Sequence, residues 1–141
     1  MSPGAPVNSA IQTLFGTASV INLSDSDDFE VQPGVYSSVY VNLKALASNA
    51  ASRKAIAKAL VPLAAKFEPD YICGMELGGC YFAAHVADSL DSDWFFYRKT
   101  DKKYNITTRI AGNEPQEGSR VVVIDDVLSS GHTIAPVVDE L

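Results

Sequence analysis

Cysteine, histidine and positive charge are scarce in this sequence. Its 141 residues include two cysteines and two histidines, and 11 basic residues against 17 acidic ones give a net charge of −6. Two cysteines, Cys73 and Cys80, are too few for a disulfide framework, and a zinc site needs more ligands. A negatively charged surface repels a nucleic-acid duplex, which argues against general nucleic-acid binding. Any anion that the protein binds must be met by a local concentration of positive groups.

Long apolar runs are also missing. No segment approaches the roughly 18 apolar residues of a membrane-spanning helix, and no basic stretch followed by an apolar run opens the sequence. We therefore expect a cytoplasmic protein without a membrane partner. With 47% hydrophobic and 20% charged residues the composition is ordinary for a globular protein. A single domain over residues 1–141 is expected, large enough to bury roughly 68% of its unfolded surface.

Short apolar segments alternate with helical patterns along most of the chain. The expected strands are 71–74, 94–97 and 120–124, and the expected helices are 48–66, 80–90 and one from about 133. Pro62 predicts a kink or a break in the first helix. Strands that lack polar alternation are typical of parallel sheets covered on both faces. The sequence therefore predicts a Rossmann-like α/β fold, with a mostly parallel sheet, flanking helices and a ligand site beyond the carboxyl ends of the strands.

The strongest chemical signal follows the strand expected at 120–124. Asp125 and Asp126 come directly after it, and a Ser/Gly/Thr loop then leads into the last helix. Hydroxyls and backbone N–H groups in such a loop suit a phosphate, and Gly131 permits its close approach. The carboxylates suit ribose hydroxyls and a bound Mg²⁺. An ordinary strand-to-helix turn, with Asp and Ser as caps, is the alternative interpretation.

This segment resembles the phosphoribosyl pyrophosphate motif of type I phosphoribosyltransferases, which has four apolar residues, two acidic residues, two further residues and a Ser/Thr-rich loop with a central glycine. The resemblance implies the fold of that family and a Mg²⁺-dependent pentosyltransferase. It implies that Asp125 and Asp126 are catalytic and hold the metal, directly or through ribose hydroxyls and water. The residues implied to bind the 5′-phosphate are Val127, Leu128, Ser129, Ser130, Gly131, His132 and Thr133.

A second motif lies between the strand expected at 71–74 and the helix expected at 80–90. The loop Glu76-Leu77-Gly78-Gly79 is similar to the diphosphate loop of the same family, in which backbone N–H groups approach the diphosphate. Without that resemblance, a Gly-Gly pair before a helix indicates only a tight turn. The resemblance implies that Glu76, Leu77, Gly78 and Gly79 bind substrate.

A third signal is the basic segment 98–109, which has five basic residues and one acid. A solvated loop is the plain interpretation. However, Arg-Lys-x-x-Lys after an aromatic strand is similar to orotate phosphoribosyltransferases, whose loop supplies a catalytic lysine to the neighbouring subunit. This implies that Lys102 is catalytic, that Arg98, Lys99 and Lys103 bind the diphosphate, and that the 99–109 loop reaches across a homodimer. The family's following His-Gly is Tyr104-Asn105 here.

The N-terminal part agrees with this family. Residues 29–43 read as two strands around a turn at Pro33-Gly34, and their order resembles the base-side segment of the orotate enzymes. Phe29 and Gln32 would lie on the base side, with Gln32 in the place of a family lysine. We therefore divide the domain into a base-side segment, 1–43, and a core, 44–141. Relatives carry further strands after the last helix, so we expect a C-terminally short core, either natural or truncated.

The predicted reaction transfers ribose 5-phosphate from phosphoribosyl pyrophosphate to orotate. It yields orotidine 5′-monophosphate and pyrophosphate, a step of pyrimidine biosynthesis. Two alternatives stay open: a phosphoribosyltransferase for a purine or another base, and a non-catalytic relative that binds phosphoribosyl pyrophosphate. The Arg98-Lys99-x-x-Lys102 pattern favours orotate, whereas Gln32 and Tyr104-Asn105 favour the non-catalytic relative.

Overall fold

A computed structural model describes most of the chain in two compact units. The described residues are 16, 20–26, 28–99, 109–128 and 130–141. The units comprise residues 1–55 and 56–141. The single domain predicted from the length stays a prediction. None of the described helices has the length and apolar character that crossing a membrane requires.

The first unit contains two antiparallel ribbons. Its strands are β1 (Ile21–Leu23), β2 (Phe29–Gln32), β3 (Val35–Ser37) and β4 (Val39–Val41). β2 pairs with β3 around the predicted Pro33-Gly34 turn, where Gly34 has a φ of 74° that suits glycine. β1 pairs with β4, and the stacked rings of Phe29 and Tyr40 lie 5.8 Å apart between centroids. The second strand expected within 29–43 is divided between β3 and β4, and the pairing of β4 with the short strand β1 was not predicted.

Two helices and a short 3₁₀ turn replace the single helix predicted at 48–66. They are α2 (Leu43–Ser48), α3 (Ala50–Ala64) and η1 (Ala65–Phe67). Asn49 separates the helices, and its side-chain oxygen accepts the backbone N–H of Ser52 at 3.0 Å. This bond satisfies one of the free donors in the first turn of α3. α3 continues through Pro62, so a break at that residue is wrong; the helix tolerates the loss of one backbone hydrogen bond there.

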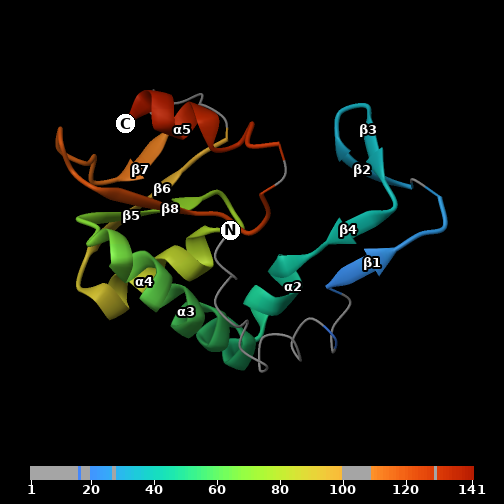
Figure 1. Ribbon diagram of the computed structural model, residues 1–141, viewed down its shortest axis with the longest axis horizontal. Coiled ribbons are helices and arrows are strands. Elements are labelled where there is room, and N and C mark those ends of the chain that lie inside the picture. Colours follow the sequence, from blue (N-terminus) through green and yellow to red (C-terminus); the bar gives the residue numbers. More distant parts are fainter. Residues whose placement is uncertain (1–15, 17–19, 27, 100–108, 129) are drawn as a thin grey trace, which may run out of the picture. The chain divides into compact units, whose positions relative to one another are not determined.

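The second unit is built on a four-stranded sheet in the order β7-β6-β5-β8 (Figure 1). Its strands are β5 (Tyr71–Met75), β6 (Asp93–Tyr97), β7 (Ile110–Gly112) and β8 (Val121–Ile124). β5 is parallel to both β6 and β8, whereas the edge strand β7 is antiparallel to β6. The predicted mostly parallel sheet is confirmed, and β7 is an addition that its short sequence did not indicate.

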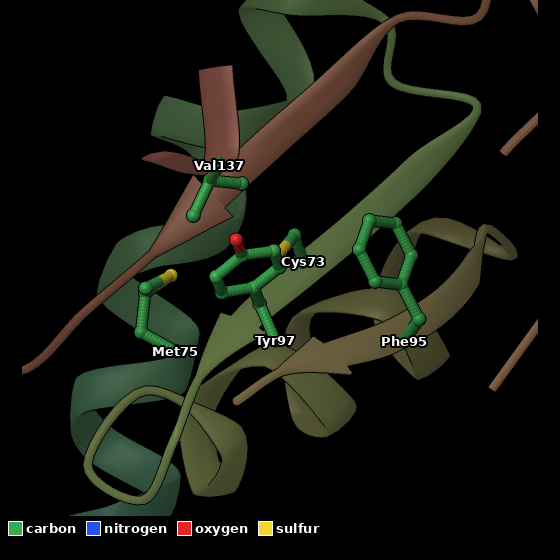
Figure 2. Packing of buried hydrophobic residues seen from close by; sticks show 5 residues of the cluster. All are labelled: Cys73, Met75, Phe95, Tyr97 and Val137. Atoms are coloured by element: carbon green, nitrogen blue, oxygen red, sulfur yellow. The ribbon is translucent and has the colours of Figure 1, made fainter. Parts of the chain in front are cut away.

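Helices lie on both faces of this sheet. The helix α4 (Cys80–Leu90), confirmed at its predicted bounds, packs closely on β5. A Cβ on Gly74 would lie 2.8 Å from the Cα of Cys80, so glycine permits this approach. The helix α5 (Ala135–Glu140) packs Val137 against the opposite face. Figure 2 shows the resulting core cluster, which comprises Cys73, Met75, Phe95, Tyr97 and Val137.

Candidate active site

The strand register brings three predicted motifs to one edge of the sheet. Gly74 lies opposite Ile124, and Met75 lies opposite Tyr97. The segments that follow β5, β6 and β8 therefore leave the sheet side by side (Figure 1). This is the carboxyl edge, where parallel α/β sheets bind their ligands.

Two glycines allow the loop after β5 to lie directly against the end of β8. A Cβ on Gly78 would come within 2.1 Å of the carboxyl carbon of Asp126. A Cβ on Gly79 would come within 2.0 Å of the carbonyl oxygen of Ile124. Neither position accepts a larger residue without displacement, and the preceding Glu76–Leu77 peptide bond is cis. The Gly-Gly loop and the paired carboxylates therefore form one site.

The paired carboxylates lie in a partly buried position. Asp125 accepts the backbone N–H of Asp126 on Oδ1 at 2.8 Å. Burial raises the pKa of Asp125, and the neighbouring Asp126 carboxyl adds to the rise. The backbone N–H of Asp126 and the charge of Lys99 act in the opposite direction. The edge therefore holds concentrated negative charge with a lysine within electrostatic reach.

Lys99 and Arg98 differ in their surroundings although they are neighbours in sequence. Lys99 lowers the pKa of Asp125, and Arg98 is not among the charges that shift it. The Arg98 guanidinium instead lies over the Phe96 ring, 5.3 Å from its centroid. It also lines a cavity of about 540 Å³ beside Trp94. Its Nη1 atom is buried and has no hydrogen-bond partner in the described part of the chain.

The loop between Asp126 and α5 has the turn geometry that its sequence predicts. Gly131 has a φ of 81°, and its carbonyl accepts the backbone N–H groups of Ile134 and Ala135, each at 3.0 Å. Ser130 Oγ lies 3.1 Å from His132 Nδ1. Both side chains therefore lie at the turn that the resemblance assigns to a phosphate.

Apolar side chains project beside the carboxylates. Val127 and Leu128 follow Asp126 directly and are exposed, Leu128 to 69%. Leu77, in the loop after β5, is also exposed. Exposed apolar residues at a polar edge offer contact to an apolar or planar part of a ligand.

Several predicted site residues are not placed by the structure. Lys102, Lys103 and Ser129 lie outside the described residues, as does the side chain of Gln32. Phe29 belongs to the first unit, where its ring stacks on Tyr40. The roles predicted for these residues stay predictions.

One set of contacts near the site was missed by sequence reasoning. Arg109 Nη1 lies 3.5 Å from the Tyr97 hydroxyl and 3.5 Å from Glu140 Oε1. Tyr97 lies in β6, Arg109 directly precedes β7 and Glu140 lies in α5, so no spacing pattern in the sequence connects the three residues. The basic count of segment 98–109 included Arg109 but gave no sign of its acidic partner.

The donor set at the carboxyl edge suits an oxygen-bound cation. Among the residues whose placement is known, no group of three or more His, Cys, Asp or Glu side chains could hold a metal by itself. Mg²⁺ is usually bound by one or two carboxylates together with waters and substrate phosphates. Asp125 and Asp126 fit a metal that is shared with a phosphorylated ligand.

A glycine loop packed on paired carboxylates, at the carboxyl edge of a mostly parallel sheet, places the protein among the α/β folds whose candidate ligand site lies at that edge. The sequence model of the phosphoribosyl transferase domain matches residues 42–141, and the chain belongs to this family.

Relatives with established names point to one branch of the family. The chain is 30% identical over 125 residues to the orotate phosphoribosyltransferase of Sinorhizobium medicae, covering 86% of this chain and 53% of the relative. It is 31% identical over 123 residues to that of Methanococcus maripaludis, covering 86% of this chain and 66% of the relative. The chain thus spans between about half and two thirds of the length of these relatives.

Solved structures share the fold. Orotate phosphoribosyltransferase from Aeropyrum pernix gives a TM-score of 0.73 at 24% identity, over 92% of this chain and 71% of that one. A UMP synthase from Leishmania donovani gives 0.77 at 21% identity, over 94% of this chain and 28% of that one. The predicted type I phosphoribosyltransferase fold is confirmed.

Proposed function

We propose that this protein is an orotate phosphoribosyltransferase, which forms orotidine 5′-monophosphate and pyrophosphate from orotate and phosphoribosyl pyrophosphate. The observation that carries the proposal is the packing of Gly78 against Asp126, which joins a diphosphate loop and a ribose-binding motif. Orotate is supported by the names of relatives about 30% identical over most of the chain.

Each part of phosphoribosyl pyrophosphate, the donor substrate, would contact a different group at the carboxyl edge. The 5′-phosphate would lie on the Ser130–Thr133 turn, and the diphosphate on the loop 76–79 with Lys99 beside it. Asp125 and Asp126 would accept hydrogen bonds from the ribose hydroxyls. This arrangement holds the anomeric carbon at a fixed place, which is the main requirement of a substitution between two bound reactants.

The reaction forms a bond from an orotate ring nitrogen to the anomeric carbon and breaks the bond from that carbon to pyrophosphate. The proton of the ring nitrogen leaves to the departing pyrophosphate or to solvent. Negative charge builds on the departing pyrophosphate, so a nearby cation stabilises the transition state. Lys99 is the described cation that acts on this edge. Lys102 and Lys103, which follow it, would add to this stabilisation by resemblance to the orotate enzymes.

We propose Mg²⁺ as the cofactor. Asp125 and Asp126 would hold it together with oxygens of the donor, directly or through water and ribose hydroxyls. The ion would supply positive charge beside the diphosphate. Burial and then the neighbouring Asp126 carboxyl raise the pKa of Asp125, and a cation beside the two carboxylates would offset both causes, which supports the proposal.

We also propose a homodimer in the cytoplasm as the working form. Arg98 supports the dimer, because its buried Nη1 lacks an acceptor among the described residues and it faces a cavity lined by aromatic rings. A buried guanidinium donor without a partner costs free energy, and a second copy could supply the missing acceptor. Residues 100–108 lie outside the described chain, so their reach into a neighbouring site stays a prediction from the resemblance.

Orotate consumption in the presence of phosphoribosyl pyrophosphate and Mg²⁺, followed by absorbance, tests the proposal. We expect turnover that falls strongly in Lys102→Ala and in the Asp125→Asn, Asp126→Asn double variant. A panel of adenine, hypoxanthine and uracil separates the other bases. Turnover with a purine alone would replace orotate. Donor binding by calorimetry, without turnover on any base, would identify a non-catalytic relative.

A further inference from the structure

Three polar side chains from different elements meet at the base of the basic segment. Tyr97 ends β6, Arg109 precedes β7, and Glu140 is the last residue of α5. Arg109 Nη1 lies 3.5 Å from the Tyr97 hydroxyl oxygen and 3.5 Å from Glu140 Oε1. Burial and, after it, the neighbouring Glu140 carboxylate raise the pKa of the Tyr97 hydroxyl. We refer to these three residues as the Tyr97 network.

Core packing fixes the centre of this network. Tyr97 is 1% exposed, and its ring lies in the cluster with Met75 and Val137. Figure 2 shows its hydroxyl directed from β6 toward Val137 of α5. A buried tyrosine hydroxyl requires a hydrogen-bond partner, which Arg109 provides while it pairs with Glu140. The rigid ring therefore sets where the two charged side chains come together.

The network lies between two parts of the candidate site. Lys99 follows the end of β6 by two residues, at the same edge of the sheet from which Asp125 and Asp126 follow β8. The backbone N–H of Arg98 donates to the carbonyl of Arg109 at 2.9 Å, which ties the two ends of segment 98–109 together. Glu140, at the other side, belongs to the helix that follows the turn at 131–134. The Tyr97 network thus connects the end of β6, which Lys99 follows, with α5, the helix that follows the turn at 131–134.

We propose that Tyr97, Arg109 and Glu140 are positioning residues that hold Lys99 at the carboxyl edge of the sheet, where Asp125 and Asp126 also lie. This inference rests on the proposed function, because it concerns how that site grips its phosphorylated donor. Phosphoribosyl pyrophosphate must contact Lys99 and the two carboxylates at the same time. If the distance between these groups is already fixed in the free protein, less free energy is lost to ordering them on binding. None of the three residues needs to touch the donor.

Calorimetric titration with phosphoribosyl pyrophosphate and Mg²⁺ measures this effect. Tyr97→Phe keeps the buried ring and removes the hydroxyl, and Glu140→Gln removes the charge from the ion pair. A hydrogen bond worth about 0.5–1.5 kcal/mol corresponds to a Kd that rises roughly two- to twelvefold. Asp139→Asn, which removes the same charge one residue earlier on the exposed surface of α5, is the matched control and should leave Kd unchanged.

A Lys99→Ala background separates positioning from general destabilisation. If the network acts through Lys99, Glu140→Gln causes no further loss of donor affinity once Lys99 is absent. An equal loss in both backgrounds, or no loss in either, overturns the inference. The two proposals also fail separately: wild-type protein that does not bind the donor contradicts the proposed function.

Amide hydrogen exchange of Arg98 tests the network without any ligand. The backbone N–H of Arg98 donates to the Arg109 carbonyl. Because the network holds Arg109 in place, the Arg98 amide should exchange faster in Tyr97→Phe and Glu140→Gln than in Asp139→Asn. Equal exchange in the three variants would mean that the network does not hold this point of the chain.

Discussion

The two edges of the sheet in the second unit differ in how completely their charged side chains are paired. At the amino edge, the Arg120 guanidinium lies 2.8 Å from Glu68 Oε2 and 3.6 Å from Asp70 Oδ2. Backbone groups add two hydrogen bonds between the same residues. Asp70 Oδ2 accepts the backbone N–H of Arg120 at 2.8 Å, and the Arg120 carbonyl accepts the backbone N–H of Asp70 at 2.9 Å. The Arg120 backbone N–H, followed by its guanidinium, lowers the pKa of Asp70. These charges satisfy one another.

The carboxyl edge leaves its charges only partly satisfied. Burial raises the pKa of Asp125 and the neighbouring Asp126 carboxyl adds to the rise, and Arg98 Nη1 has no acceptor within the described segments. Buried charges that are only partly satisfied cost stability, and they are more frequent at functional sites than elsewhere. The comparison teaches that the charges of the amino edge are paired within the chain, whereas those of the carboxyl edge are candidates for contact with a ligand.

The largest effect is expected from Gly79→Ala. Its Cβ would come within 2.0 Å of the Ile124 carbonyl oxygen and 2.7 Å of the Met75 nitrogen, both backbone atoms that cannot move aside. We expect a loss of about 3 kcal/mol or more in the free energy of unfolding, at the upper end for overpacking. Urea titration followed by circular dichroism measures it.

Gly78→Ala is the matched variant one residue earlier. The three atoms nearest to its Cβ all belong to the Asp126 side chain, which can rotate away at the cost of its place in the site. We expect nearly unchanged stability with a donor Kd raised about tenfold or more, for a displacement worth roughly one hydrogen bond to a charged group. Equal losses of stability in both variants would contradict the direct packing of this loop on β8.

Substitution of Asp125 and of Asp70 compares the two edges directly. Asp125→Asn should lower turnover by roughly a hundredfold, as the loss of one preorganised polar group does in other enzymes. It should not lower the free energy of unfolding at neutral pH, because it removes a charge that burial penalises. Asp70→Asn should do the reverse, lowering stability and leaving turnover unchanged. Thermal unfolding and the orotate assay, run on both variants, check this comparison.

The pH dependence of unfolding gives the sign of each contribution. The folded pKa of Asp70 lies below its ordinary value of 3.8, so its stabilisation is complete above that value and is lost as the pH falls toward the folded pKa. The folded pKa of Asp125 lies above 3.8, so its cost appears as the pH rises through that pKa. Relative to wild type, Asp125→Asn should therefore gain stability from acid to neutral pH. A gain for Asp70→Asn over the same range would reverse the assignment of the two edges.

Apolar patterns predicted the elements that carry the site. The unbroken runs of β5, β6 and β8 and the helix α4 are long enough to be recognised, and their order places their loops at one edge. The predicted motifs at Gly78-Gly79 and Asp125-Asp126 follow from that order, and the structure confirms that they meet.

What the sequence did not predict depends on contacts between distant residues. The contact of Arg98 with the Phe96 ring depends on how the chain leaves β6 after Tyr97, which no spacing pattern indicates. The pairing of Arg109 with Glu140 arises only once α5 packs on the sheet through Val137. α3 likewise continues through Pro62, because a helix held by its neighbouring turns tolerates one missing hydrogen bond.

The smallest effect concerns Cys80, which reports the negative charge of the carboxyl edge. Its pKa is raised to about 11, first by burial, then by the charge of Glu76 and to a smaller extent by that of Asp125. The thiolate is the form that reacts, so alkylation by iodoacetamide should keep rising about tenfold per pH unit between about pH 7 and 10. An ordinary cysteine levels off near about pH 8.5.

Variants of the two acids sharpen this measurement. Glu76→Gln should accelerate alkylation of Cys80 more than Asp125→Asn does, in the order of their contributions to its pKa. Cys73, which is completely buried and has a pKa raised to about 12, should stay unlabelled and serve as the internal control for folding. A rate that levels off near pH 8.5, or that neither variant changes, would mean that the carboxyl edge does not concentrate negative charge at the start of α4. The contrast between the two edges would then rest on the ion pairs of Arg120 alone.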